Sequence, residues 1–444
     1  MPEESFMGRR LFAPPTLWQD WGDDPETGDV SYWELFVDLL LVAAASSLAD
    51  TLRGNLSLSG VIEFGCLYMV VIGGWILYTH HYTSRFNDAS LTHSLLLFLF
   101  LVGMAVTVVN ASYEHVQYFG MGLLTQRIAF LIMLHGVYAT MYERCGVMVR
   151  TMAEYILINM VLYGVLVAFP SAAWCIMPIL ALLELLGELT LTALPRSAVV
   201  PINIEHSKDR LGVSCLVMIG ETIISITMEY REHMEAGGLS DRVETPYYTL
   251  LALAFLLVFM FTLLYFNMQP PPALHAFRRS LPSGWSVLVL HKLMGLSLLA
   301  VGVAIKVAVS TVVEEEELTP FASRLLGIAV GTSLLNLFAM RLCHFGFRRN
   351  AKVSTFAYRV MCFWWLSFGV FSVLPFFYMG ILDPVQAFLW QSLSMAVLCV
   401  LETCFTHILE TQITANAFLG IEEEDEQPHE GTGLIKAKHK LQYH

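Results

Sequence analysis

Apolar residues occur in long runs along this chain of 444 residues, and short polar segments separate the runs. A helix needs roughly 20 apolar residues to cross about 30 Å of hydrocarbon. The runs have this length and predict about twelve membrane-spanning helices, near 33–53, 60–82, 91–110, 124–143, 151–169, 172–194, 209–228, 247–268, 285–310, 322–343, 355–381 and 384–412. The predicted fold is therefore an all-α polytopic membrane protein.

The polar segments between the runs predict the orientation. Lysine and arginine are concentrated in alternate segments, which matches a cytosolic N-terminus by the positive-inside rule. An even number of spans then places both termini in the cytosol. We expect four regions: an acidic cytosolic arm (1–30), a first six-helix half (31–196), a second six-helix half (197–412) and a charged cytosolic tail (413–444). The polar arm has no apolar core, so no cleavable signal peptide is expected.

The two predicted halves contain similar spacings. Arg127 and Arg144 bracket the fourth span and lie seventeen residues apart, as do Arg324 and Arg341 around the tenth. His93 and His291 each open a run that has a glycine about ten residues on. Because six spans are an even number, two such halves run parallel, an arrangement found in transporters.

The amino-acid composition argues against several classes of protein and partner. The chain is 56% hydrophobic and 14% charged, against about 25% charged in a soluble domain, so a lipid bilayer is its expected environment. The net charge is −13, and without a basic stripe a nucleic-acid partner is not expected. The eight cysteines lack metal-ligand spacing and are interpreted as small core residues, so no metal is expected.

The first apolar run contains two carboxylates, Glu34 and Asp38, which a helix stacks on one face. Charged groups inside membrane segments need a partner or an aqueous cavity. Other polar residues lie at a similar predicted depth at the cytosolic ends of the second and seventh spans: Arg85, Asn87, His206, Asp209 and Arg210. We expect Glu34 or Asp38 to pair with Arg85 or Arg210.

Further charges lie deeper in the runs. Glu221 is the candidate titratable or cation-binding group, because it lies deep in the seventh span. Glu184 and Glu188 stack in the sixth span, and a third group lies in the ninth and twelfth spans: Lys292, Lys306 and Glu402. These charges have two interpretations. They form a cytosolic gate and a solute or ion path, or they are ion pairs that hold helices in register.

Motifs of soluble enzymes are absent from the sequence, including the phosphate-binding loop, the dinucleotide fingerprint and the nucleophile elbow. No catalytic residue or cofactor is therefore indicated. The leading hypothesis is a secondary transporter or ion-conducting permease for an unidentified small solute or ion. The alternatives are an intramembrane lipid-modifying hydrolase and a non-transporting scaffold or sensor.

Four stretches resemble the bacterial low temperature requirement A (LtrA) family. The segment 33–42, WELFVDLLLV, is similar to its ELFFDLVFV opening, and 75–87 to its W-T-Y-RF-D pattern. His206-Ser-Lys-Asp-Arg210 resembles its H-x-x-E-R, and Ile219-Gly-Glu221 its L-G-E. The resemblance implies a multi-pass membrane protein. The chain has Asn87 and Asn267 where the family usually has aspartate, so any role of those carboxylates does not transfer directly.

Overall fold

The computed structural model describes residues 13–18, 32–87, 90–187, 189–235, 241–270, 275–345 and 355–412. Most of the predicted acidic arm and the whole predicted tail lie outside these residues. The described chain is almost entirely helical and contains ten helices long and apolar enough to cross a membrane. The predicted all-α polytopic membrane fold is confirmed.

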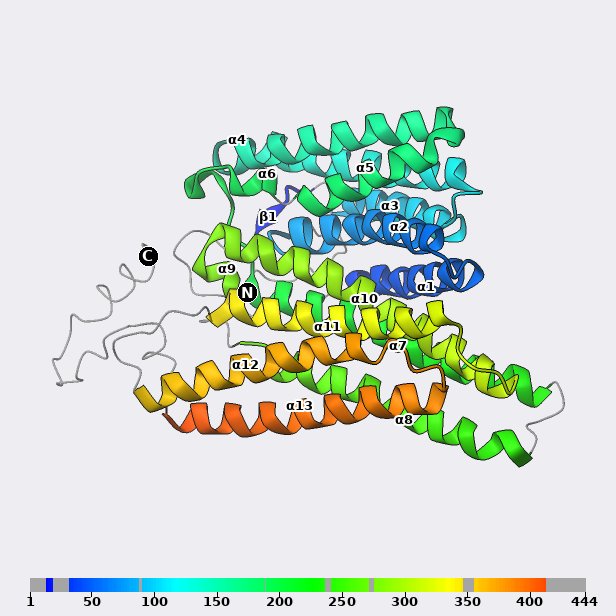
Figure 1. Ribbon diagram of the computed structural model, residues 1–444. Coiled ribbons are helices and arrows are strands. Elements are labelled where there is room, and N and C mark those ends of the chain that lie inside the picture. Colours follow the sequence, from blue (N-terminus) through cyan, green and yellow to red (C-terminus); the bar gives the residue numbers. More distant parts are fainter. Residues whose placement is uncertain are drawn as a thin grey trace. The chain divides into compact units, whose positions relative to one another are not determined.

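The chain divides into two compact units, Met1–Glu221 and Thr222–His444. The first unit ends within α7 (Ile204–Glu235) and otherwise contains β1 (Thr16–Leu17), α1 (Tyr32–Gly54), α2 (Leu58–Ile76), the π-helix η1 (Leu77–Thr83), β2 (Phe86–Asn87), α3 (Leu91–Val109), α4 (Val116–Ala168), η2 (Pro170–Ala172), α5 (Ala173–Leu186), α6 (Leu189–Thr192) and η3 (Arg196–Ala198). Figure 1 labels most of these elements. The predicted boundary between the halves, 196/197, lies earlier in the chain.

The second unit begins with the end of α7 and is built from long helices: α8 (Asp241–Asn267), the short α9 (Ala276–Arg279), α10 (Leu281–Val313), α11 (Pro320–Phe345), α12 (Thr355–Phe377) and α13 (Pro384–Gln412). Within it α10 packs on α11, α11 on α12, and α12 on α13, and α13 also packs on α8 (Figure 1).

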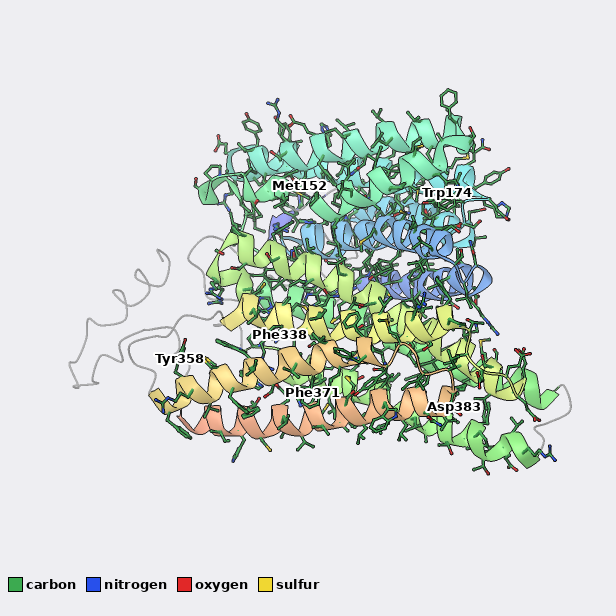
Figure 2. All side chains as sticks on the ribbon, viewed as in Figure 1. Met152, Trp174, Phe338, Tyr358, Phe371 and Asp383 are labelled. Atoms are coloured by element: carbon green, nitrogen blue, oxygen red, sulfur yellow. The ribbon has the colours of Figure 1, made fainter. Side chains whose placement is uncertain are left out.

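Capping residues fix where several helices begin. Asp383 lies directly before α13 (Figure 2), and its Oδ1 accepts a hydrogen bond from the Gln386 backbone N–H at 2.8 Å. Pro384 follows it at the first helical position, where no backbone donor is needed. Thr319 and Pro320 start α11 in the same way, with Thr319 Oγ1 accepting from the Ala322 N–H at 3.2 Å.

Helix α4 is two antiparallel helices joined by a sharp kink. A straight helix would separate Gly120 from Val167 by about 70 Å, yet a Cβ at Gly120 would lie 2.9 Å from Cγ2 of Val167. The chain reverses at Met141, the one residue of α4 with non-helical angles (φ −130°, ψ 32°). The predicted spans 124–143 and 151–169 correspond to the two arms.

The predicted span 209–228 lies in α7, which is not among the ten candidates found in the described residues. The two arms of α4 are counted as one candidate, and α7 is not counted. These two differences account for ten candidate helices against twelve predicted spans. The count of twelve stays a prediction.

Backbones approach closely where α3 crosses the first arm of α4. A Cβ on Gly103 would lie 2.7 Å from the Gly122 carbonyl oxygen, and a Cβ on Gly122 would lie 2.7 Å from that of Gly103. Small residues at such crossings let membrane helices pack backbone to backbone. The contact holds α3 beside α4 and so positions Gln126 and Arg127 toward the centre of the unit.

We predict that Gly103→Ala destabilises the protein by about 1–3 kcal/mol, because the added methyl group overlaps backbone atoms that cannot move independently. Thermal unfolding of the detergent-purified protein measures this. The matched control is Gly136→Ala in the first arm of α4, where a Cβ meets no atom within 4 Å. Equal melting temperatures for the two variants would contradict the close approach.

Candidate functional site

The candidate site begins in the first turns of α1, where Glu34 and Asp38 lie on one face of the helix. Both are buried, with 4% and 6% of their surface exposed, whereas Leu35 and Phe36 are about half exposed. The helix therefore turns its two charges into the protein and its apolar side chains outward, the reverse of a soluble helix. Charges buried in this way require partners.

Asp38 is paired with Arg210 of α7, and both side chains are buried. The indole Nε1 of Trp75 donates a second hydrogen bond to the same oxygen of Asp38 at 3.0 Å. The Arg210 guanidinium carbon also lies 5.6 Å from the Trp75 ring centroid, within the range of a cation–π interaction. One carboxylate, one arginine and one tryptophan thus connect α1, α2 and α7.

Glu34 is paired with His206, one turn before Arg210 on α7. The Glu34 Oε1 and His206 Nε2 atoms lie 3.0 Å apart, and both side chains are buried. Arg210 also donates to the Glu34 backbone carbonyl at 3.3 Å. Because the two carboxylates and their two partners have the same four-residue spacing, the helices pair in register. We call Glu34, Asp38, His206 and Arg210 the charge cluster.

Arg85 anchors the end of the second span through backbone carbonyls. It follows the π-helix η1 and donates to the carbonyls of His80 (2.9 Å), His81 (3.3 Å) and Val200 (3.3 Å). The last carbonyls of a helix lack intrahelical partners, and a guanidinium supplies several donors at once. The Arg85 carbonyl in turn accepts from the Trp18 N–H at 3.0 Å, beside the β1–β2 pair.

The π-helix η1 brings His80 and His81 into the interior, and both are buried. His80 Nδ1 lies 2.5 Å from the hydroxyl of Ser207, the residue after His206. π-helical turns are rare and frequently occur at functional sites. The sequence analysis did not single out His80 as a site residue. Trp75, which donates a hydrogen bond to Asp38, appeared in the sequence analysis only within the stretch 75–87 that resembles the family.

Besides Arg85, two predicted site residues lie outside the four that define the charge cluster. Asn87 is exposed in β2, where its carbonyl accepts a hydrogen bond from Thr16 Oγ1 at 3.4 Å. Asp209 is exposed on α7, because a one-residue step turns it about 100° from Arg210. Both lie close to the cluster in sequence, but neither faces it.

Glu221 lies on the same face of α7 as Arg210 and is 3% exposed. Eleven residues are just over three full turns, so the two side chains differ by about 20° in direction and lie about 16 Å apart along the helix. Ser214 is also buried on this face. The face therefore presents polar side chains at several depths: His206, Arg210, Ser214 and Glu221.

A second buried ion pair connects α4 and α5 in the first unit. Arg127 contacts Glu184, which also accepts hydrogen bonds from the hydroxyls of Tyr163 (2.8 Å) and Tyr155 (3.2 Å). Gly73 of α2 leaves the space for this carboxylate, because a Cβ there would overlap it. The sequence analysis expected Glu188 to stack with Glu184, but Glu188 lies outside the described residues.

The third buried ion pair lies in the second unit. Arg341 of α11 and Glu402 of α13 form a two-pronged pair, with one contact of 2.6 Å. Trp364 of α12 donates to Glu402 at 2.6 Å, and its ring lies 3.5 Å from the arginine carbon. The sequence grouped Glu402 with Lys292 and Lys306, but the geometry gives it Arg341 instead. In the sequence analysis Arg341 appears only for its distance of seventeen residues from Arg324.

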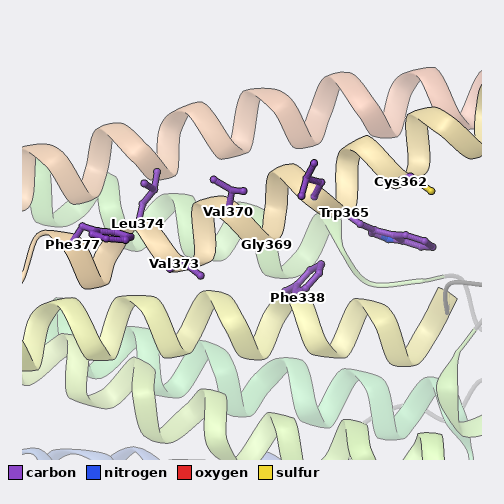
Figure 3. A pocket seen from close by; sticks show the side chains of 9 residues that line it. Phe338, Cys362, Trp365, Gly369, Val370, Val373, Leu374 and Phe377 are labelled. Atoms are coloured by element: carbon purple, nitrogen blue, oxygen red, sulfur yellow. The ribbon is translucent and has the colours of Figure 1, made fainter.

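A groove of about 660 Å³ runs along α12 in the second unit, between that helix and Phe338 of α11 (Figure 3). Apolar and aromatic side chains line it, apart from the thiol of Cys362. Val370 and Phe377 are largely exposed there. Such a surface suits lipid chains and offers no polar route for a solute.

In the described part of the chain, no group of three or more His, Cys, Asp and Glu side chains is close enough to hold a metal ion. The charge cluster brings cations and carboxylates together in pairs. Its arrangement can transfer protons or exchange ion-pair partners, but it does not present a free set of oxygen ligands.

We predict that Glu184→Leu destabilises the protein by about 3–5 kcal/mol, because Arg127 then remains buried without its carboxylate. The double variant Arg127→Met/Glu184→Leu should recover most of the loss, since it buries no charge. Thermal unfolding in detergent measures both, and Glu154→Leu, from an exposed pair on α4, is the control. A double variant no more stable than Glu184→Leu would contradict this account.

The comparisons with known proteins agree with the sequence resemblance. The family model described as bacterial low temperature requirement A protein (LtrA) matches residues 29–401. This range includes the whole charge cluster and Arg341 of α11, but not Glu402, the partner of Arg341. No curated protein and no solved structure matches the chain. The chain belongs to the bacterial low temperature requirement A family of multi-pass membrane proteins.

Proposed function

We propose that this protein is a secondary transporter or ion-conducting permease whose charge cluster acts as a cytosolic gate. The observation that carries the proposal is the pair of buried contacts between α1 and α7, Asp38 with Arg210 and Glu34 with His206. Gate residues must hold a closed state and still be able to separate. Ion pairs between two helices meet both requirements.

The cost of burying these charges favours a functional role over a purely structural one. Well-packed apolar side chains often stabilise a protein as well as a buried ion pair does. Ionisable residues inside membrane segments commonly mark ion or substrate pathways. The cluster is also incompletely bonded: among the described atoms, Arg210 Nε and Nη1 and Asp38 Oδ2 have no hydrogen-bond partner. Buried polar atoms are rarely left so, which supports access of water or solute.

The polar face of α7 supports a path deeper into the first unit. It carries Ser214 and Glu221 beyond Arg210, and each is buried. The matching face of α1 becomes apolar beyond Asp38, with Leu41, Ala45 and Leu48 buried. In this proposal α7 carries the polar path, and Glu221 is the deep titratable or cation-binding group.

Similar contacts in the two units support the proposed six-helix duplication. In the first, Arg127, Tyr163 and Glu184 come from the fourth, fifth and sixth predicted spans; in the second, Arg341, Trp364 and Glu402 come from the tenth, eleventh and twelfth. In both, the fourth-position arginine pairs with the sixth-position glutamate, and an aromatic donor from the helix between bonds that glutamate. The set recurs in the same order of spans in the proposed halves, 31–196 and 197–412, although Arg127 lies near the start of its span and Arg341 near the end of its own.

A histidine–tyrosine contact gives a second correspondence. His93 of the third span stacks on Tyr82 of the second, with ring centroids 5.3 Å apart, and His291 of the ninth span accepts or donates a hydrogen bond with Tyr265 of the eighth at 3.1 Å. The environments are not identical, since Arg324, the counterpart of buried Arg127 in the arginine spacing, is exposed. Parallel repeats of this kind commonly enclose a transport pathway.

A scaffold or sensor is the second candidate, because the same ion pairs could only hold helices in register. It differs from the transporter in one measurable respect. Disrupting the pairs would then affect stability without changing flux per folded molecule. The lipid-hydrolase alternative has no comparable support from the described residues.

We predict that Glu221→Gln abolishes ion flux while the protein still folds, because the amide keeps the shape of the side chain but neither titrates nor carries charge. The purified protein is reconstituted in liposomes, and flux of H⁺, Na⁺, K⁺ and Cl⁻ is followed under imposed gradients. Glu154→Gln, an exposed carboxylate on α4, is the control. Wild-type flux in Glu221→Gln would remove that residue from the path. Absence of flux in the wild-type protein for all four ions would favour the scaffold.

The proposed orientation places both termini in the cytosol. In a cysteine-free background, we predict that a cysteine at Glu316, between α10 and α11, reacts with a membrane-impermeant maleimide in intact cells. A cysteine at Glu143, beside the kink of α4, should react only after the cells are opened. Both residues are exposed, so access to the side chain does not limit the comparison. The reverse labelling pattern would invert the topology.

A further inference from the structure

The chemistry of the two pairs in the charge cluster indicates which ion passes the proposed cytosolic gate. The two pairs differ in chemistry, although they lie one helical turn apart. A guanidinium does not give up its proton in proteins, so the pair of Arg210 with Asp38 can separate but cannot exchange a proton. Imidazole is the side chain that ordinarily gains and loses a proton near neutral pH, and a carboxyl group, such as that of the partner Glu34, can also take up a proton.

From this difference we propose that the proton is the ion carried, and that the Glu34–His206 pair carries it at the cytosolic end of the path. The inference rests on the transport function proposed above and names its ion. The step needs no other reactant. The Nε2–H bond of protonated His206 breaks and an O–H bond forms on Oε1 of Glu34, which turns an ion pair into a neutral acid and a neutral imidazole. The reverse step restores the pair.

The position of the two groups suits this transfer. The Nε2 and Oε1 atoms form an ion pair 3.0 Å apart, and both side chains are at least nine-tenths buried. Both stay in place on two helices that the neighbouring Asp38–Arg210 pair holds in register. A fixed ion pair thus positions an exchangeable one.

A second donor–acceptor pair lies on the next residue of α7. Ser207 Oγ and His80 Nδ1 are 2.5 Å apart and both residues are buried. A hydroxyl can donate and accept at once, and imidazole can take a proton at one nitrogen and release it at the other. The site therefore contains two neighbouring groups able to pass protons, supplied by the π-helix η1 and by α7.

The same contacts disfavour a metal cation at this place. Sodium, potassium and calcium bind through several oxygen ligands. Here each carboxylate already faces a nitrogen donor, Asp38 from Arg210 and Trp75, and Glu34 from His206. A metal cation would have to displace a cationic side chain, whereas a proton needs only one donor and one acceptor.

Titratable and charged side chains from several elements lie in the region of His206. They are Glu34 and Asp38 from α1, His80 and His81 from η1, Arg85 after η1, and Arg210 from α7 itself. The proposed transfer therefore takes place in a region that holds charges of both signs.

The test uses full-length protein in liposomes that contain a fluorescent pH indicator, with proton entry driven by a potassium-diffusion potential. Two substitutions separate proton transfer from pairing. His206→Arg keeps a cation opposite Glu34 but cannot release a proton, and His206→Gln keeps a hydrogen-bond donor without charge. We expect each to lower proton flux at least tenfold and to flatten its dependence on pH between roughly 5 and 8. His115→Gln, an exposed histidine, should leave both unchanged.

The outcomes distinguish this inference from the transport function itself. Folding of each variant is checked by thermal unfolding, and the conservative His206→Arg variant keeps the ion pair in case His206→Gln fails to fold. Proton flux that His206→Arg retains would overturn the inference. A wild-type protein that carries Na⁺, K⁺ or Cl⁻ but not protons would also overturn it, and the transport function would stand. A wild-type protein that carries none of these ions would overturn both.

Discussion

The cost of holding arginine away from water governs the interior of both units. Arg210, Arg127 and Arg341 are each almost fully buried, and each has one carboxylate and at least one aromatic ring as partners. The carboxylate offsets the charge, while the flat ring covers the face of the guanidinium and excludes water. None of these side chains could remain buried alone, so each fixes the rotation of the helices that supply its partners. Apolar side chains alone would pack almost as well at other rotations.

The broad architecture could be predicted because it depends on one-dimensional properties. The length of the apolar runs located the spans, since hydrocarbon thickness sets the length of a helix. The four-residue spacing of Glu34 and Asp38 placed both on one face, because helical geometry is regular. Arg210 was already one of two expected partners for them. The starts of α13 and α11 also have a sequence signal, because a capping residue, Asp383 or Thr319, directly precedes a proline.

Partners between distant helices were harder to predict, because they depend on rotation and depth that apolar runs do not encode. Glu184 appeared to stack with Glu188, yet its partner Arg127 comes from another helix. Glu402 was grouped with lysines, whereas Arg341 lies opposite it. Asp209 was placed with the cluster because of its predicted depth at the cytosolic end of the seventh span, but helical geometry turns it outward. The general need for a counter-charge was predictable in each case, but the identity of the partner was not.

The kink at Met141 has a consequence for how the chain enters the membrane. The two arms of α4 join through one non-helical residue, with no loop that could let them move independently. Contacts near the far ends of the arms, such as Gly120 with Val167, form only when both arms are present. The second arm also supplies Tyr163 to the pair made by Arg127 of the first. The hairpin should therefore integrate as a single unit during synthesis, with its first arm retained beside the insertion machinery until the second has emerged.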